Sequence, residues 1–247
     1  MRKNFDIIYG NPRQCLFAMV LPMMAAMFLN MAYNLVDSLW IGNLLGESAY
    51  AALTAATPIL LLLNSIAMGA TNGVAILLSQ AIGAGETRRT RTILFTSFIL
   101  SIVFSLGMTG LLEGMVSPLL RFLQVPSELY EMTCLYLRIY LIGYGAVYLY
   151  CYFAAVLRSF GDTVFQMLAM LVCTVLNGAL DPLLIHGFGL QGAAAATVLS
   201  QGICLGFIVC YLRKKALFSF HAADWSGKEL GTICLKSLPA AFQQSIP

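Results

Sequence analysis

The segment "TVFQMLAMLVCTVLNGALDPLLI", residues 163–185, is long and apolar enough to cross a lipid bilayer as a single helix. A membrane span needs about 20 predominantly apolar residues. Lipid offers no partners for unpaired backbone groups, so the chain must be helical there. The segment holds one acidic side chain, Asp181, which is followed directly by Pro182. A carboxylate at membrane depth costs about 2.5–3.5 kcal/mol on insertion scales, so Asp181 is a candidate for a functional role.

The rest of the chain has the same character. Of its 247 residues, 60% are hydrophobic and 10% are charged, whereas a soluble domain carries roughly 25% charged residues. Five more apolar segments lie at 14–41, 50–81, 91–116, 129–157 and 190–213. The sequence therefore predicts an all-α, polytopic membrane protein with six transmembrane helices. Glycines four residues apart predict close helix packing at Gly69–Gly73, Gly110–Gly114 and Gly202–Gly206.

Basic residues mark one side of the membrane. Twelve of the fourteen lie before the first span, in the second and fourth loops, or after the sixth span, and the exceptions are Arg121 and Arg138. This distribution predicts a cytoplasmic N-terminus, with lipid around the helices. It also explains the net charge of +3, so no nucleic-acid partner is predicted.

The last residues, "SLPAAFQQSIP" at 237–247, begin a further apolar segment. Their Leu238–Pro239 step repeats the Leu21–Pro22 step of the first span, which indicates a two-repeat transporter. We therefore predict a six-helix lobe over 1–213, a cytoplasmic linker over 214–236 and the start of a seventh transmembrane helix over 237–247. On this interpretation the partner of this lobe is a second lobe of the same chain. We therefore expect no export by the 247-residue chain alone. A half-size subunit that dimerises is the alternative.

Two aspartates stand out among the few ionisable residues within the spans. Asp37 and Asp181 each lie four residues before a predicted outer helix end, which places them at a shared depth of about 6 Å. Each ends a polar stripe on one helix face: Asn30, Asn34 and Asp37, with Tyr33 one turn below, on the first span, and Thr174, Asn177 and Asp181 on the fifth. We expect the two stripes to line a shared, wet cavity.

The prolines add a second feature. Pro182 has no N–H group, so it frees the carbonyl of Gly178 beside a carboxylate and an amide. Such an oxygen set suits a hard monovalent cation. Pro22 is a candidate bend point of a moving first helix. The competing interpretation is a simple kink, in which the polar groups only bond one another across helices.

The sequence offers no support for an enzyme or for a bound cofactor. The seven cysteines form no CxxC pair, and neither a Walker A motif nor HExxH or GxSxG occurs. An intramembrane aspartyl protease would also use two membrane aspartates, but its GxGD motif is missing, and "GALD" at 178–181 does not fit.

Several stretches, in order along the chain, resemble the MATE (multidrug and toxic compound extrusion) transporters. They are "NLVDSLWIGNLLGESAYAAL" at 34–53, "SQAIGAGE" at 79–86, "RSFGDT" at 158–163, "NGALDPLLI" at 177–185 and "GLQGAAAATVLSQ" at 189–201. The resemblance covers residues 16 to 213. Within the family, the sequence is similar to the DNA-damage-inducible F-like branch.

The resemblance implies a twelve-helix transporter of two six-helix lobes. Such a transporter exports cationic or amphipathic xenobiotics in exchange for Na⁺ or H⁺. The branch's cation site falls on Asp37, Asn177, Asp181 and Thr197, and its helix-bending proline falls on Pro22. A lipid-linked oligosaccharide flippase of the same superfamily is the alternative function, although such flippases carry more basic residues in the central cavity than the single Arg138 available here.

Overall fold

The structure, a computed structural model, describes residues 12–215 and 226–245. Within these ranges the chain is all-α, as the sequence predicts. The helices are α1 (Pro12–Leu45), α2 (Glu47–Gly83), α3 (Thr87–Phe122), α4 (Ser127–Ser159), α5 (Thr163–Phe188), α6 (Leu190–Lys214) and α7 (Gly227–Ser245). The first six are long and apolar enough to cross a membrane by length and composition, which makes the chain a multi-pass membrane protein.

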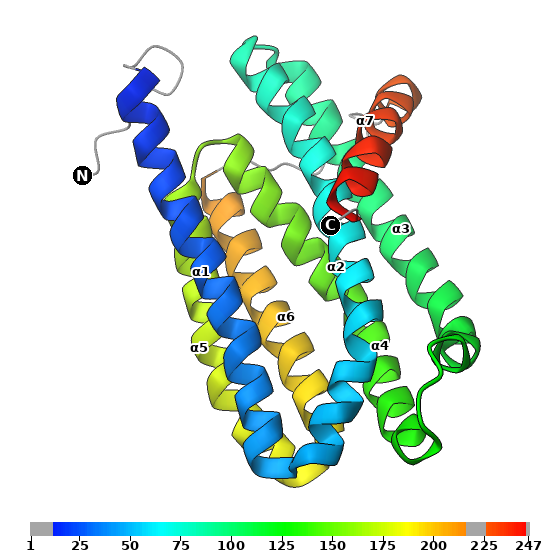
Figure 1. The fold of residues 1–247 in the computed structure, drawn as a ribbon. Coiled ribbons are helices and arrows are strands. Elements are labelled where there is room, and N and C mark those ends of the chain that lie inside the picture. The colour runs from blue at the N-terminus through cyan, green and yellow to red at the C-terminus, as the bar shows by residue number, and fades with distance from the viewer. Residues whose placement is uncertain (1–11, 216–225, 246–247) are drawn as a thin grey trace.

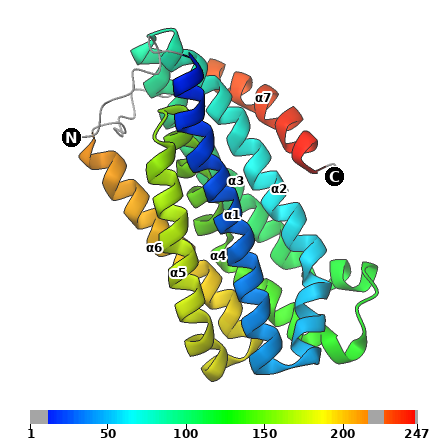
Figure 2. The same cartoon turned by 60° about the vertical axis from the view of Figure 1, so that its left-hand side comes forward.

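The helices form two groups that share α4 (Figure 1). Helices α1, α5 and α6 pack together on one side, while α2 and α3 pack with α4 on the other. Helix α4 joins the groups because it packs against α2, α3 and α6. Figure 2, turned by 60°, shows α7 on the outer side of α2, away from α5 and α6. The bundle therefore has a first side around α1 and a second side capped by α7.

A repeated tyrosine explains why α4 can sit in the centre. Tyr136, Tyr140, Tyr144, Tyr148 and Tyr152 recur every fourth residue and are all buried, so they share one helix face. The Tyr144 hydroxyl donates to the Leu63 carbonyl at 3.0 Å, and the Tyr152 hydroxyl donates to the Leu94 carbonyl at 2.8 Å. These bonds tie α4 to α2 and α3 while satisfying the buried hydroxyls.

Short turns separate the first six helices, in the gaps between the predicted apolar segments. Each of the five turns contains one residue with a positive φ angle: Gly46, Gly85, Gln124, Gly161 and Gly189. Glycine adopts this backbone conformation without the steric cost that a Cβ imposes. The turns therefore stop each helix sharply and send the chain back through the bundle.

The helices are longer than predicted, and this corrects the expected depth of the two acids. The prediction ended each span where the apolar run ended, but backbone hydrogen bonding carries α1 on to Leu45 and α5 on to Phe188. Asp37 and Asp181 therefore lie eight and seven residues from these ends, about 10–12 Å inside the bundle rather than about 6 Å. The two acids still share a depth.

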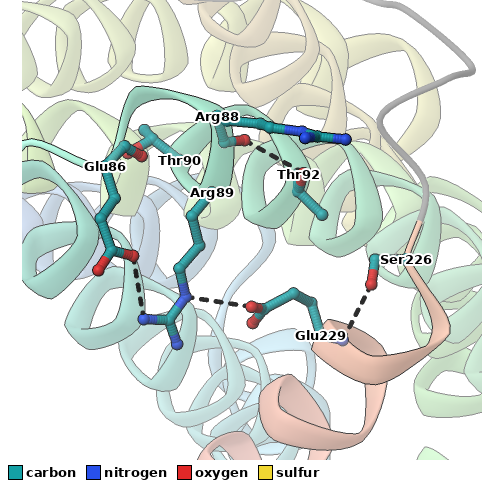
Figure 3. Close-up of polar contacts among 7 residues, drawn as sticks. All are labelled: Glu86, Arg88, Arg89, Thr90, Thr92, Ser226 and Glu229. Atoms are coloured by element: carbon teal, nitrogen blue, oxygen red, sulfur yellow. Dashed lines mark hydrogen bonds and ion pairs between the residues drawn. The ribbon is translucent and has the colours of Figure 1, made fainter.

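Helix α7 begins at Gly227, ten residues before the predicted start of a seventh helix at 237. The early start follows from capping, because the Glu229 amide donates to the Ser226 hydroxyl at 3.5 Å (Figure 3). Residues 216–225 of the predicted linker lie outside the described residues.

Of the three predicted glycine pairs, only Gly69–Gly73 makes close contact, and it does so with α7. Around Gly110, Gly114, Gly202 and Gly206 the described part of the chain leaves the space of a Cβ open.

The α4–α5 turn and the end of α6 are joined by a polar contact. The Lys215 ammonium lies 2.8 Å from the Asp162 carboxylate, which also accepts from the Tyr211 hydroxyl at 2.5 Å. Burial alone would raise the pKa of Asp162, but these hydrogen bonds, the charge of Lys215 and the Phe165 amide outweigh it and hold the pKa below its usual value. The contact fixes α5 against α6 at the end of the bundle where α1 begins (Figure 1).

Candidate cation-binding site

The four residues expected to bind a cation come together where α1, α5 and α6 meet. Asp37 lies on α1, Asn177 and Asp181 lie on α5, and Thr197 lies on α6. Asn177 and Asp181 are 0% exposed, and Asp37 and Thr197 are 9% and 6% exposed. Two carboxyl groups, an amide and a hydroxyl are thus removed from the surface within one region of the bundle.

Small residues allow these helices to approach. A Cβ added at Gly178 of α5 would lie 3.3 Å from the Val36 side chain of α1. A Cβ added at Gly192 of α6 would overlap the Leu184 backbone of α5. Both glycines lie close in sequence to the expected ligands, so the same segments supply the polar groups and the close packing.

The polar atoms of the site are incompletely paired. The Asn177 amide donates to one oxygen of Asp181 at 3.1 Å. Four oxygens are buried without a hydrogen-bond partner: the Tyr33 hydroxyl, Asp37 Oδ1, Asn177 Oδ1 and Asp181 Oδ2. Most buried polar atoms in proteins are paired, so a cluster of four unpaired oxygens requires an explanation.

The charges of the site are also uncompensated. Asp37 lies near enough to Asp181 for the two carboxylates to repel each other. Within the described residues, no salt bridge involves either acid. Arg138, the basic residue inside the fourth span, is exposed on α4. Two carboxylates in an apolar interior are costly without a counter-charge, so the arrangement favours the uptake of a proton or a small cation.

Three more side chains adjoin the site, and the sequence analysis gave no role to two of them. Tyr33 of α1 faces Thr197 and Ser200 of α6, and Ser200 is 0% exposed. Tyr136 of α4 is 2% exposed and lies within electrostatic range of both aspartates. The four-residue tyrosine repeat of α4 could have indicated Tyr136. Ser200 lies one turn beyond Thr197 and therefore shares its face.

The other expected cavity-lining residues, Asn30, Asn34 and Thr174, are less buried than the four expected ligands. Asn30 and Asn34 are exposed, and the Asn34 amide donates to the Asn30 carbonyl at 2.8 Å. Thr174 donates to the Met170 carbonyl within α5 at 2.9 Å and lies 3.4 Å from the Leu29 carbonyl of α1. Tyr33 and Asp37 of the predicted stripe on α1 are thus buried, whereas the two asparagines are exposed.

The two candidate hinge prolines lie inside uninterrupted helices. Pro22 is in α1, and Pro182 is in α5 directly after Asp181. Each removes one backbone N–H, which leaves the helix locally weaker four residues earlier. The Gly178 carbonyl, four residues before Pro182, is the one that loses its helical partner.

The ligand set suits a hard cation. Carboxylate, amide and hydroxyl oxygens are typical ligands of such ions, and the unpaired oxygens are free to accept. In the described part of the chain, no group of three or more His, Cys, Asp or Glu residues could hold a metal ion.

The chain resembles known transporters over nearly its whole length. It is 31% identical over 247 residues to the "Probable multidrug resistance protein YpnP" of Bacillus subtilis, covering 99% of this chain and 56% of that protein. It is 29% identical over 240 residues to the "FAD transporter" of Shewanella oneidensis, covering 92% of this chain and 53% of that protein. The chain thus spans about half the length of the curated relatives it matches.

A solved structure described as an outward-facing multidrug resistance MATE family transporter of the MOP superfamily is similar as well. The two structures superpose with a TM-score of 0.91 and share 28% sequence identity. The match covers 99% of this chain and 55% of the solved chain. The MatE family model matches residues 22–183, which contain Asp37, Asn177 and Asp181. This match covers more than half of the sequence, and the chain therefore belongs to the MATE family of transporters.

Proposed function

We propose that the chain is the first lobe of an antiporter that exports cationic or amphipathic xenobiotics in exchange for Na⁺ or H⁺. The chain is then a transporter rather than an enzyme. The multidrug resistance relatives support the reaction class. The observation that carries the coupling is the cluster of four buried, unpartnered oxygens on Tyr33, Asp37, Asn177 and Asp181.

The proposed coupling follows from the charges. When the site is empty, Asp37 on α1 repels Asp181 on α5. When a proton or Na⁺ binds among Asp37, Asn177, Asp181 and Thr197, the repulsion is relieved and α1 can lie closer to α5. Occupancy therefore biases the position of α1, with Pro22 as the bend point, and a moving α1 reshapes the substrate cavity between the lobes.

The distribution of charge supports a cationic or neutral substrate. Within the described residues, no arginine or lysine is buried beside the two acids. An anionic substrate, such as the one named for the Shewanella relative, would require basic groups to offset its charge. The same argument disfavours a flippase for lipid-linked phosphosugars, which remains an outcome of the test below.

The proposed orientation has the N-terminus in the cytoplasm of a bacterial cell, with the α2–α3 turn on the same side. The basic residues Arg88, Arg89, Arg91 and Arg158 support it through their positions at that end of the bundle. An impermeant thiol reagent applied to intact cells tests it, using single cysteines at positions 46 and 88 of a cysteine-free variant. We expect the reagent to label position 46 alone. Labelling of position 88 alone would show that the true orientation is the reverse of the proposed one.

Proteoliposomes test the proposed transport. The chain is reconstituted alone and joined to the remaining half of YpnP, and efflux of a cationic dye is measured against imposed Na⁺ and pH gradients. We expect gradient-driven efflux from the fusion protein and none from the chain alone, because alternating access needs two lobes. The fusion protein carrying Asp37→Asn and Asp181→Asn together should bind lipid and fold normally but lose the gradient dependence.

Two results would overturn the proposal. The first is full gradient-driven efflux by the double variant, which would return both acids to a structural role. The second is transport of an oligosaccharide lipid, but no dye, by the unaltered fusion protein. Asn177→Ala gives an intermediate check, because it removes one neutral ligand and should weaken the cation dependence without abolishing efflux.

A further inference from the structure

Three sulfur-containing side chains meet in the interior of the bundle, where α1, α5 and α6 pack together. Met170 and Cys173 lie on α5 and Cys204 lies on α6, and with Tyr33 of α1 they form one buried cluster. Met170 and Cys173 are three residues apart and therefore share a helix face. The exposed fractions of Met170, Cys173 and Cys204 are 7%, 1% and 0%. These three residues are here called the sulfur cluster.

The two thiols of the sulfur cluster face each other across the contact between α5 and α6. Each of these thiols interacts with the other more strongly than with any other side chain. Both cysteines are free and are not joined by a disulfide. Two thiols that meet in this way from different helices can both bind one small ion.

The thioether of Met170 is the third sulfur. The Tyr150 hydroxyl of α4 donates to Met170 Sδ at 3.4 Å, and Tyr150 also lies within electrostatic range of both thiols. The three sulfur atoms therefore gather near one hydroxyl group. A thioether sulfur has two lone pairs, so Met170 Sδ can accept this hydrogen bond and still bind a metal ion.

A second hydroxyl adjoins the sulfur cluster. Tyr33 is 6% exposed, and its hydroxyl is buried without a hydrogen-bond partner. Tyr33 lies within electrostatic range of Cys173 and also faces Thr197 of the cation site. An unpaired hydroxyl in this position can donate to a metal-bound sulfur, as outer hydrogen bonds do at many metal sites.

The chemistry of the donors selects among metal ions. Thiolate and thioether sulfurs are soft ligands that favour Cu⁺ over hard cations such as Na⁺ and Mg²⁺. Zn²⁺ also binds thiolate, but a structural Zn²⁺ site has four ligands drawn mainly from cysteine and histidine. Within the described residues, no group of three or more His, Cys, Asp or Glu side chains could hold a metal ion. Two thiols and a thioether therefore suit Cu⁺, which accepts fewer ligands than Zn²⁺.

We propose that Met170, Cys173 and Cys204 form a binding site for Cu⁺, a soft monovalent metal ion, which joins α5 to α6. One thiol binds as a thiolate and releases its proton, while the second thiol and the thioether bind as neutral sulfur. The positive charge of Cu⁺ replaces that of the released proton, so the site stays uncharged in its apolar surroundings. The step needs no oxidant, and the proposal does not depend on the proposed antiport.

Copper binding to the purified 247-residue chain in detergent tests the proposal. A variant that keeps only Cys173 and Cys204 is titrated with Cu⁺ without oxygen, in competition with the chelator bathocuproine disulfonate. We expect about one Cu⁺ per chain after gel filtration, and X-ray absorption at the copper edge should show sulfur neighbours only. The five replacements in this variant are Cys15→Ala, Cys134→Ala, Cys151→Ala, Cys210→Ala and Cys234→Ala.

The matched control keeps Cys134 and Cys151 and carries alanine at the other five cysteine positions. These two cysteines lie on α4 and are about 25 Å apart along its axis, so one ion cannot join them. The control has the same number of thiols in the same bundle, and it should retain no Cu⁺ against the chelator.

The parent chain provides a second arm that decides the question if circular dichroism shows that five replacements unfold the bundle. In the parent, Cys173→Ser and Cys204→Ser should each lower the retained copper by about one equivalent. Met170→Leu should weaken the binding about ten-fold or more, since loss of an outer partner alone typically costs that much.

Equal copper retention by the two paired-cysteine variants would overturn the proposal. Unchanged retention by both serine variants of the parent chain would overturn it too, as would nitrogen or oxygen neighbours around the bound copper. The assay measures no transport and leaves Asp37, Asn177, Asp181 and Thr197 intact. It can therefore fail while the proposed antiport stands, and it can succeed while the antiport fails.

Discussion

The serine hydroxyls beside α7 and the oxygens buried at the junction of α1, α5 and α6 differ in their hydrogen-bond partners. Around a cavity between α2, α3, α4 and α7, the hydroxyls of Ser97, Ser101 and Ser237 each donate to a backbone carbonyl at 2.6–3.0 Å. Around the junction of α1, α5 and α6, four oxygens on Tyr33, Asp37, Asn177 and Asp181 are left without a partner. Ser97 and Ser101 are 1% and 4% exposed, so at these two serines the difference does not come from access to water.

The contrast separates packing from binding. An unpaired buried polar group costs about 1–3 kcal/mol, and serines at helix spacing avoid that cost by bonding the preceding turn. Four neighbouring oxygens that stay unpaired at this cost are available to bind a ligand. The α1 side is thus suited to bind a charged particle, and the serines of the α7 side are suited to packing.

Of the changes considered, removing a single acid of the α1 side should have the largest effect, which is a loss of gradient-driven efflux. In the fusion protein, Asp37→Asn and Asp181→Asn are each expected to lower gradient-driven efflux by about ten-fold or more, the factor that corresponds to 1.4 kcal/mol of lost coupling. Glu113→Gln is the matched control. Glu113 is a half-buried acid of α3 that also has an unpaired oxygen, but it is not part of the four-oxygen cluster. Less than two-fold change is expected there, and an equal loss would mean that any membrane acid matters.

Gly192→Ala should have the next largest effect, because the added methyl group overlaps the Leu184 backbone and forces α5 and α6 apart. We expect a loss of about 1–3 kcal/mol, as for overpacked cores. Thermal unfolding in detergent measures it. Gly202→Ala, on the same helix with open space around it, should be neutral or slightly stabilising, as expected when alanine replaces glycine in a helix. Equal effects of the two changes would contradict the close approach at the site.

Removing one tyrosine hydroxyl from each side of the bundle allows the stability effects on the two sides to be compared directly. Tyr152→Phe removes a hydroxyl that bonds the Leu94 carbonyl at 2.8 Å and Ser97 at 3.0 Å, and should cost about 1 kcal/mol of unfolding free energy. Tyr33→Phe removes an unpartnered hydroxyl and should leave the stability unchanged or raised. Melting temperatures of the two variants decide. A larger loss for Tyr33→Phe would show that its hydroxyl is already bonded in the protein.

The smallest expected effect concerns Asp162. Its pKa is held below the usual value, so it stabilises the folded chain above the pKa of an unfolded aspartate, and this stabilisation is lost as the pH falls through the folded value. Asp162→Asn should lower the melting temperature at neutral pH by about 1–2 °C. The variant and the parent should converge in acid, and a difference that widens there would contradict the assignment.

Much of the fold was predictable because membrane helices follow length and apolarity. The six spans, their turns and the shared depth of Asp37 and Asp181 all follow from the sequence. The helix ends were placed too early, because hydrogen bonding continues past the apolar run. The exposure of Asn30 and Asn34 depends on how α1 is rotated against α5, and spacing along one helix cannot specify that rotation. The contact between Gly73 and α7 pairs segments more than 150 residues apart, and no local signal identifies such a partner.

The central claim is that the pair Asp37 and Asp181 holds a proton or a Na⁺ ion. Infrared difference spectroscopy of the purified 247-residue chain, titrated with Na⁺ and with acid, tests it without transport. We expect a carboxyl band that changes on titration in the parent chain and in the Glu113→Gln variant, and that is absent from the Asp37→Asn/Asp181→Asn double variant. A double variant whose difference spectrum matches that of the parent would contradict the claim.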